Sequence, residues 1–502
     1  MGKSLFLGID CGTQSTKVLV YDLDRKKVVA RGAAPHTMVS REDGTREQEA
    51  LEWVQALTLA MKGIPKALRA SIHGIGVSGQ QHGFVPIDRS GNPIRPVKLW
   101  CDTSTVRECG EIMAACGGEK AMIRRTGNPI LPGYTASKVL WLKKHEPKAY
   151  RAMAHLLLPH DFLNFWLTGK LTMEWGDASG TGFLDVRRRA WDLTVLKAID
   201  GKRDLRACLP PLIGPHEWAG TLSRRAASHL GLPEGVPVSA GGGDNMMGAI
   251  GTGTQEDGSL TMSLGTSGTL YGYASKPVID PDGNLAAFCS STGGWLPLLC
   301  TMNCTVATEQ WRGFLGKSLP ELERLAARAP VGSDGVVTLP FFNGERSPNL
   351  PRGRASLLGL TMGNLNEANV LRSAMESAVF GLKFGWESFQ RLGLRAREIK
   401  LIGGGSKSRL WRQMTADAFE VPVVTPVEEE AAAFGASLQA AWAVGSGGKA
   451  DRPALNRLLA RHVRMNRAAQ TKPSPRTGPA QERAYLRYKN HLAALAPLYR
   501  PE

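Results

Sequence analysis

LFLGIDCGTQSTKVLVY, residues 5–21, contains two short apolar runs on either side of a polar loop. Leu5 to Ile9 and Lys17 to Tyr21 have the length and apolar content of β-strands. The loop between them is rich in glycine and in hydroxyl side chains, so the stretch predicts a strand, a polar turn and a second strand.

The same layout recurs in the second half of the chain. Leu260 to Leu264 predicts a strand, Gly265-Thr266-Ser267-Gly268 a turn, and Thr269 to Tyr273 a further extended segment. Two matching hairpins indicate an ancient duplication. Neither turn has the spacing of a P-loop or of a dinucleotide-binding GxGxxG turn. The pair instead favours the actin-like ATPase architecture.

We therefore expect an α/β fold with two actin-like (ribonuclease H-like) ATPase domains around a central cleft. The domains are placed at 1–252 and at 253–446. A basic extension with a terminal helix follows at 447–502. Periodicity predicts helices at Glu47–Leu68, Ala136–His145, Asn366–Leu392, Ser408–Phe419 and Gln481–Leu495, and strands at Ile72–Ser78, Val236–Ala240 and Glu398–Ile402.

The composition excludes several classes of protein. A chain of 502 residues with 42% hydrophobic residues can bury a large core. The net charge of +17 is concentrated toward the end, where residues 446–502 carry 12 Lys or Arg against 3 acids, and it is interpreted as a solvated basic face, with no nucleic-acid partner. No apolar span of membrane length is found. Eight cysteines without a CxxC pair fit a reducing cytoplasm.

The first polar loop has the chemistry of a phosphate site. Gly12 permits close approach of backbone N–H groups, and Thr13, Ser15 and Thr16 add hydroxyl donors. A carboxylate repels phosphate, so Asp10 at the strand end is expected to hold Mg²⁺ through water. An ordinary polar hairpin remains the alternative for this loop.

Asp244 is the candidate for the catalytic base. It follows three glycines at a strand end and opens a predicted helix. Capping of that helix is the alternative role, but a cap does not require three glycines, which do allow a ligand to approach closely. A carboxylate in reach of a hydroxyl can accept its proton during phosphoryl transfer.

Other polar groups also follow strands. Gln81 and His82, flanked by glycines, can bond neighbouring hydroxyls of a polyol or serve the structure alone. Trp100 and Asp102 would add an aromatic wall and a carboxylate. Gly403-Gly404-Gly405 before Ser408 suits the adenosine part of a nucleotide, and Asn343-Gly344-Glu345-Arg346 is interpreted as a structural loop near the cleft.

Together these stretches resemble the FGGY carbohydrate kinases over about residues 5–498. The resemblance rests on GIDCGTQSTK, GQQHG, LWCDTS, RTGNPILPGYTASKVLWLKKHEP, LLPHDFLNFWLTG, GDASGTGFLDV, AGGGDNMMGAIG, SLGTSGTLYGYA, FFNGERSPNLPRGRASLLGLT and IGGGSKSRLWRQMTADAFEVPVV, in this order. The GQQHG loop is similar to that of the subgroup acting on D-xylulose. The resemblance implies ATP with Mg²⁺ and phosphorylation of the terminal hydroxyl of a ketopentose.

Site residues carry over by position. Asp244 would be the proton acceptor, with Gln81, His82, Asn245, Trp100, Asp102 and Arg124 at the sugar. Asp10 would serve the metal, and the ATP residues would be Gly12, Thr13, Gln14, Thr266, Gly404, Gly405 and Ser408. One departure is Cys101-Asp102-Thr103-Ser104, where many relatives have Asn-Asp-x-Arg, and the exact sugar stays open because of it.

Rival substrates are another pentulose, such as ribulose, or a polyol. A catalytically silent sugar-binding regulator on the same fold is the second class. The expected partners are a small sugar and ATP in the cytoplasm, without a membrane, and a homodimer remains open.

Overall fold

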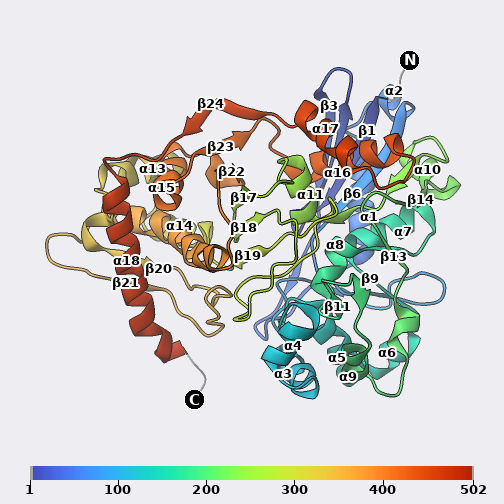
Figure 1. Ribbon diagram of the computed structural model, residues 1–502, viewed down its shortest axis with the longest axis horizontal. Helices are drawn as coiled ribbons and strands as arrows, with labels where there is room; N and C mark the ends of the chain where they lie inside the picture. The colour runs from blue at the N-terminus through green and yellow to red at the C-terminus, as the bar shows by residue number, and fades with distance from the viewer. Residues whose placement is uncertain (1–3, 500–502) are drawn as a thin grey trace.

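The computed structural model describes residues 4–499, which form two α/β lobes side by side (Figure 1). The first lobe is built on a sheet with the strand order β14-β15-β6-β1-β2-β3. Its strands are β1 (Leu5–Cys11), β2 (Ser15–Asp22), β3 (Lys27–Pro35), β6 (Ile72–Gly79), β14 (Trp218–Thr221) and β15 (Pro237–Ser239), and β16 (Gly242–Gly243) also pairs with β6.

The second lobe repeats this topology. Its sheet has the order β19-β18-β17-β22-β23-β24, formed by β17 (Ser259–Leu264), β18 (Gly268–Gly272), β19 (Leu298–Thr301), β22 (Glu398–Ile402), β23 (Val423–Pro426) and β24 (Met465–Thr471). In both lobes the first two strands form an antiparallel hairpin, and the first strand also pairs in parallel with a later strand, β6 or β22. The two hairpins predicted from the sequence are confirmed.

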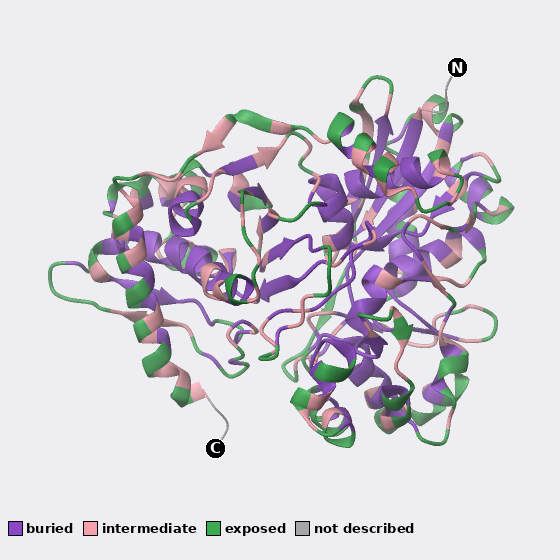
Figure 2. Cartoon of the chain, in the orientation of Figure 1, coloured by how far each residue is buried: buried purple, intermediate pink, exposed green. Residues whose placement is uncertain are grey.

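Helices cover both sheets. The first lobe has α1 (Ala50–Met61), α7 (Pro159–Thr168), α10 (Arg224–Leu230) and α11 (Asp244–Gly251), and the second has α12 (Thr305–Phe314), α13 (Leu319–Arg328), α14 (Glu367–Arg391) and α15 (Arg409–Phe419). The central strand β1 is buried on both faces, as expected where helices lie above and below a sheet. Figure 2 shows this buried interior in purple. Side chains such as Leu7, Val20 and Trp53 form the core of the first lobe.

A helical subdomain lies below the first sheet and has its own apolar core. It contains α3 (Val106–Ala115), α4 (Glu119–Thr126), α5 (Thr135–His145), α6 (Pro147–Ala152), α8 (Trp175–Ala178) and α9 (Leu193–Ile199). β4 (Val39–Ser40), β5 (Arg46–Gln48) and β8 (Val97–Lys98) form a small separate sheet. The helix predicted at Glu47–Leu68 is wrong in its bounds, because Pro65 interrupts it and separates α1 from the short α2 (Lys66–Arg69).

One helix from the second half packs on the sheet of the first. α16 (Ala431–Gly445) contacts β1, β6 and α11, and Figure 1 shows it in red beside the blue strands. Glycines make this contact possible: a Cβ on Gly8 would lie 1.8 Å from the carbonyl oxygen of Ala433, and one on Gly76 1.9 Å from that of Ala436. The helix backbone therefore rests directly on the strand backbone.

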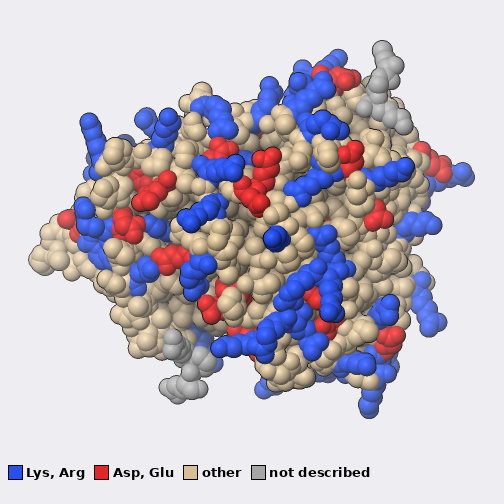
Figure 3. Space-filling model, viewed as in Figure 1, with Lys and Arg blue, Asp and Glu red and all other residues tan. Residues whose placement is uncertain are grey.

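The C-terminal segment is part of both lobes. α17 (Arg452–His462) packs on α16, and the Tyr21 hydroxyl lies 3.0 Å from Nδ1 of His462. β24 then forms the edge of the second sheet, and α18 (Gly478–Leu495) packs against α14 and α15. Lys and Arg spread over both lobes on the face in Figure 3, with Asp and Glu between them. Within residues 4–499 no helix is long and apolar enough to span a bilayer.

We predict that Gly8→Ala lowers the melting temperature by several degrees. The added methyl would overlap a main-chain carbonyl of α16, which no side-chain rotation can relieve, and overpacking of this kind typically costs about 1–3 kcal/mol. Gly110→Ala in α3 is the matched control, since a Cβ there meets nothing within 4 Å. Calorimetry of both variants should show destabilisation by Gly8→Ala alone, and equal midpoints would contradict the close contact.

Candidate functional site

A cavity of about 920 Å³ lies between the lobes and is lined by residues of both. Asp10, Lys17, Gln81, His82, Trp100, Tyr134, Asp244 and Asn245 come from the first lobe. Ser263, Ser267, Phe288, Cys300, Arg346, Gly403, Gly404, Ser406 and Lys407 come from the second. Seven of the fifteen predicted site residues therefore line one cavity: Asp10, Gln81, His82, Trp100, Asp244, Asn245 and Gly404.

Both predicted phosphate hairpins border this cavity. Asp10 and Lys17 line it from the strands of the first hairpin, and Ser267 lines it from the turn of the second. Gly12, Thr13, Gln14 and Thr266 occupy the two turns beside these lining residues but do not line the cavity themselves. The two turns thus lie at equivalent ends of equivalent strands, one in each lobe.

Asp10 lies at the end of β1, where Ser78 Oγ donates a hydrogen bond to its Oδ1 at 2.8 Å. Burial raises the pKa of this carboxyl, while the hydrogen bond and the charge of Lys17 oppose the rise. Lys17 in turn pairs with Glu430 at 2.7 Å. Nowhere in residues 4–499 do three or more His, Cys, Asp or Glu side chains gather as a metal cage.

Asp244 is the first residue of α11, and the N-cap position belongs to Gly243. The Asp244 Oδ1 accepts a hydrogen bond from the Asn245 backbone N–H at 2.8 Å and from Asn245 Nδ2 at 3.0 Å. Burial, with the nearby charges of Asp10 and Asp177, raises the pKa of Asp244 to about 7. Such a carboxyl can exchange a proton near neutral pH, which a capping group does not need to do.

Gln81 and His82 lie on the loop after β6. Asn245 Nδ2 donates to Gln81 Oε1 at 2.8 Å, so this loop is bonded to the helix that carries Asp244. The His82 ring packs against Tyr134 and Phe288, with ring centroids 5.0 and 5.5 Å away, and the three rings form one cluster. A Cβ on Gly180 would lie 1.8 Å from His82 Nδ1, so the ring rests on bare backbone.

His82 has a left-handed backbone, with φ of 63°, and its carbonyl oxygen accepts a hydrogen bond from a lysine. Lys138 Nζ donates to that carbonyl at 2.9 Å and to the carbonyl of Gly133 at 2.7 Å. Burial lowers the pKa of Lys138 to about 7. Burial and the charges of Lys138 and Arg346 also push the pKa of His82 well below its usual value, so its imidazole is neutral.

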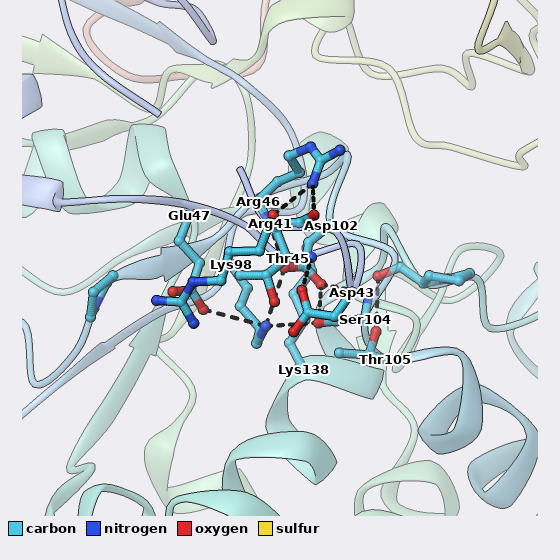
Figure 4. Close-up of polar contacts among 12 residues, drawn as sticks. Arg41, Asp43, Thr45, Arg46, Glu47, Lys98, Asp102, Ser104, Thr105 and Lys138 are labelled. Carbon is cyan, nitrogen blue, oxygen red and sulfur yellow. Dashed lines mark hydrogen bonds and ion pairs between the residues drawn. The ribbon is translucent and has the colours of Figure 1, made fainter. Parts of the chain in front are cut away.

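Trp100 lines the cavity, and its Nε1 donates to Thr13 Oγ1 at 3.0 Å. Asp102 does not line it, which corrects the expected sugar contact. Its carboxylate is fully buried and accepts hydrogen bonds from the Arg46 backbone N–H, from Lys98 Nζ and from Ser104, as Figure 4 shows. Asp102 fixes the loop behind Trp100 and has no face toward a ligand.

Arg124 is also outside the cavity lining, on the exposed side of α4. At the nucleotide end, Gly404 lines the cavity, and a Cβ on it would meet nothing within 4 Å. Gly405 instead packs against Leu264 and Trp411. Ser408 caps α15, accepting the Trp411 N–H at 3.2 Å. Gly405 and Ser408 therefore shape this end of the cavity from behind.

Sequence reasoning missed four groups at the cavity or directly behind it: Tyr134, Lys138, Phe288 and Arg346. Tyr134, Lys138 and Arg346 lie in stretches that carry the family resemblance, RTGNPILPGYTASK and FFNGERSP, but nothing in their spacing marks them as facing a ligand. Phe288 lies in a loop between β18 and β19, and only the tertiary fold brings it opposite His82.

Known proteins are similar to this chain in sequence and in fold. The xylulose kinase of Haemophilus influenzae is 43% identical over 498 residues, covering 98% of this chain and 100% of the relative. The crystal structure of a xyloylose kinase from Brucella ovis is 29% identical with a TM-score of 0.89 and covers 98% of this chain and 100% of its own. A xylulose kinase structure from Bifidobacterium adolescentis is 28% identical with a TM-score of 0.80, covering 96% and 99%.

These solved structures share the fold, so the predicted pair of actin-like domains is confirmed. Family models divide the chain in the same way. The model for the N-terminal domain of the FGGY family of carbohydrate kinases matches residues 5–251, and the model for its C-terminal domain matches residues 260–444. This chain belongs to the FGGY family of carbohydrate kinases.

Proposed function

We propose that this protein is an ATP-dependent kinase that phosphorylates the C5 hydroxyl of D-xylulose. The observation that carries the proposal is Asp244, a carboxyl with a pKa of about 7 inside a cleft bordered by two phosphate hairpins. Its relatives at 43% and 28% identity are named xylulose kinases, which supports the choice of sugar.

In this mechanism Asp244 accepts the proton of the C5 hydroxyl as the γ-phosphoryl group moves to that oxygen. Asn245 holds the Asp244 carboxylate through Oδ1 and leaves Oδ2 for the substrate. Gln81 and His82 bond the other sugar hydroxyls, and Trp100 and Tyr134 wall the pocket. The opposed turns around Thr13 and Thr266 hold the phosphates from the two lobes.

We further propose Mg²⁺ as the divalent cation, with Asp10 as its protein group. When bound, the ion neutralises phosphate charge. Asp10 is held in place by Ser78, and its raised pKa reflects a buried site where a cation would favour the ionised form. Gly403 and Gly404 then leave room for the nucleoside at the far end of the cleft.

All eight cysteines are free thiols, a state that reducing compartments maintain, and this supports a cytoplasmic enzyme. A homodimer stays a prediction, which light scattering on the purified protein decides.

A coupled ADP-release assay across ketopentoses, pentitols and aldoses tests the proposed function. D-Xylulose should give the highest kcat/KM. A higher value for ribulose or for a polyol would move the assignment within the family, and activity on no sugar in the panel would favour a silent sugar-binding regulator.

We predict that Asp244→Asn lowers kcat by at least about 10² to 10⁴ while sugar affinity changes only a few-fold. Asparagine keeps the size of the side chain but cannot accept the hydroxyl proton. Stopped-time assays give kcat, calorimetry gives the sugar Kd, and a thermal midpoint confirms folding. Asp282→Asn is the control, because this cavity carboxylate is exposed and pairs with Arg391 at the rim. Turnover of Asp244→Asn close to that of the control would remove Asp244 as the base.

We also predict an acidic limb in the pH profile. A carboxyl with a pKa of about 7 is protonated below that pH and cannot then act as a base, so kcat/KM for the sugar should fall about tenfold per pH unit below about 7. Rates are measured at subsaturating ATP and saturating Mg²⁺, so that the profile reports the free enzyme. A flat profile from pH 5 to 8 would show that the group taking the proton titrates elsewhere.

A further inference from the structure

Arg346 is a cation of the cavity wall for which residues 4–499 offer no carboxylate partner. Arg346 lines the cavity, and within residues 4–499 its guanidinium makes no ion pair and donates no hydrogen bond to an oxygen or nitrogen. The thiol of Cys300 lies within hydrogen-bond reach of its side chain. Arg346 is only partly buried, so its five N–H donors are available to acceptors of a ligand that displaces water from the cavity.

The backbone of Arg346 is fixed by its neighbour. Glu345 is buried, and its carboxylate accepts hydrogen bonds from the Met302 N–H at 2.6 Å, from Asn303 Nδ2 at 3.1 Å and from the Arg346 N–H at 2.7 Å. Glu345 and Leu350 also exchange backbone hydrogen bonds of 2.8 and 3.0 Å, which close the turn. These hydrogen bonds fix the backbone position from which the Arg346 side chain extends.

The Arg346 side chain extends from the second lobe to the first. A Cβ on Gly133 would lie 2.9 Å from Arg346 Nη2. The charge of Arg346 adds to the burial that lowers the pKa of His82 and opposes the rise that burial causes in the pKa of Tyr134, so the guanidinium lies near both cavity-lining rings. Lys138 is the other cation here, but the carbonyls of His82 and Gly133 already accept its hydrogen bonds. Arg346 is the group left to meet a ligand.

The chemistry of the proposed substrate defines what that ligand group is. In the furanose form of a 2-pentulose, O5 is bonded to C2, so the C5 hydroxyl can accept a phosphoryl group only in the open-chain form. That form has a free C2 carbonyl beside the C1 hydroxyl. Two adjacent oxygen acceptors match the fork of a guanidinium.

We propose that Arg346 is a specificity-determining residue that donates hydrogen bonds to the C2 carbonyl and the adjacent hydroxyl of the open-chain ketose. The sugar site then has contributions from both lobes, and the second lobe reads the oxidation state of C2. This inference rests on the proposed function, because it takes a 2-ketose as the substrate.

The test compares D-xylulose with D-arabinitol, in which the C2 carbonyl is reduced to a hydroxyl. Calorimetry without nucleotide gives the Kd of the ketose, competition gives the Kd of the pentitol, and sugar-independent ATP hydrolysis is measured in parallel. Arg346→Ala should weaken ketose binding about 10- to 100-fold and pentitol binding less than threefold. Arg346→Lys keeps the charge without the fork and should recover only part of the loss. ATP hydrolysis and the KM for ATP should stay within twofold.

Arg352→Ala is the matched control, since Arg352 lies six residues further along the same loop, is exposed and does not line the cavity. It should leave both affinities unchanged. Equal loss of ketose and pentitol binding in folded Arg346→Ala and Arg346→Lys would overturn the proposal that Arg346 recognises the C2 carbonyl. Loss of ATP hydrolysis with unchanged ketose affinity would assign Arg346 to phosphate and overturn the proposal.

Failure of the proposed function is seen separately, in the turnover of the unaltered enzyme. If another 2-ketose is the better substrate, the same comparison with that ketose and its polyol decides the role of Arg346.

Discussion

The direct contact between the backbone of α16 and the strands of the first sheet is the constraint on which the site depends. Gly8 and Gly76 open the sheet surface to the helix, and Gly435 lets α16 meet α11, where a Cβ would lie 1.8 Å from the Met247 carbonyl oxygen. α11 is thereby pinned between β6 and α16, and its first residue is Asp244. The position of the candidate base follows from packing that permits only glycine.

The same helix determines how the lobes are joined. The chain leaves the first lobe after α11, returns to it with α16 and α17, and leaves again into β24. The chain therefore crosses between the lobes near residues 252–258, 427–430 and 463–464. The loop between β18 and β19 joins them again, through hydrogen bonds of Ala287 to Asn128 and of Ser291 to Glu174.

The sequence predicts the fold well because the hairpins at 5–21 and 260–273 carry strong local patterns, and Asp10, Gln81, His82 and Asp244 follow strands in glycine-rich loops. The sequence does not reveal that Asp102 is buried away from the cavity, because its partners Arg46 and Lys98 come from other strands. It also interprets Arg346 as part of a structural loop, since nothing in NGERSP tells whether the side chain faces solvent or a cleft. Long-range contacts decide these cases, and composition and spacing do not encode them locally.

The buried carboxyls of the cleft also lower the free energy of unfolding of the protein. Asp244 titrates near 7 in the folded chain and near 3.8 in the unfolded one, so folding favours its protonated form. The folded state therefore loses stability as pH rises from about 4 to about 7, and the penalty is then complete, at about 4 kcal/mol by linkage. Asp10, buried in the same cleft, adds to it in the same direction. A bound cation favours the ionised form of both buried carboxyls, so its binding stabilises the protein beyond the contacts that it makes.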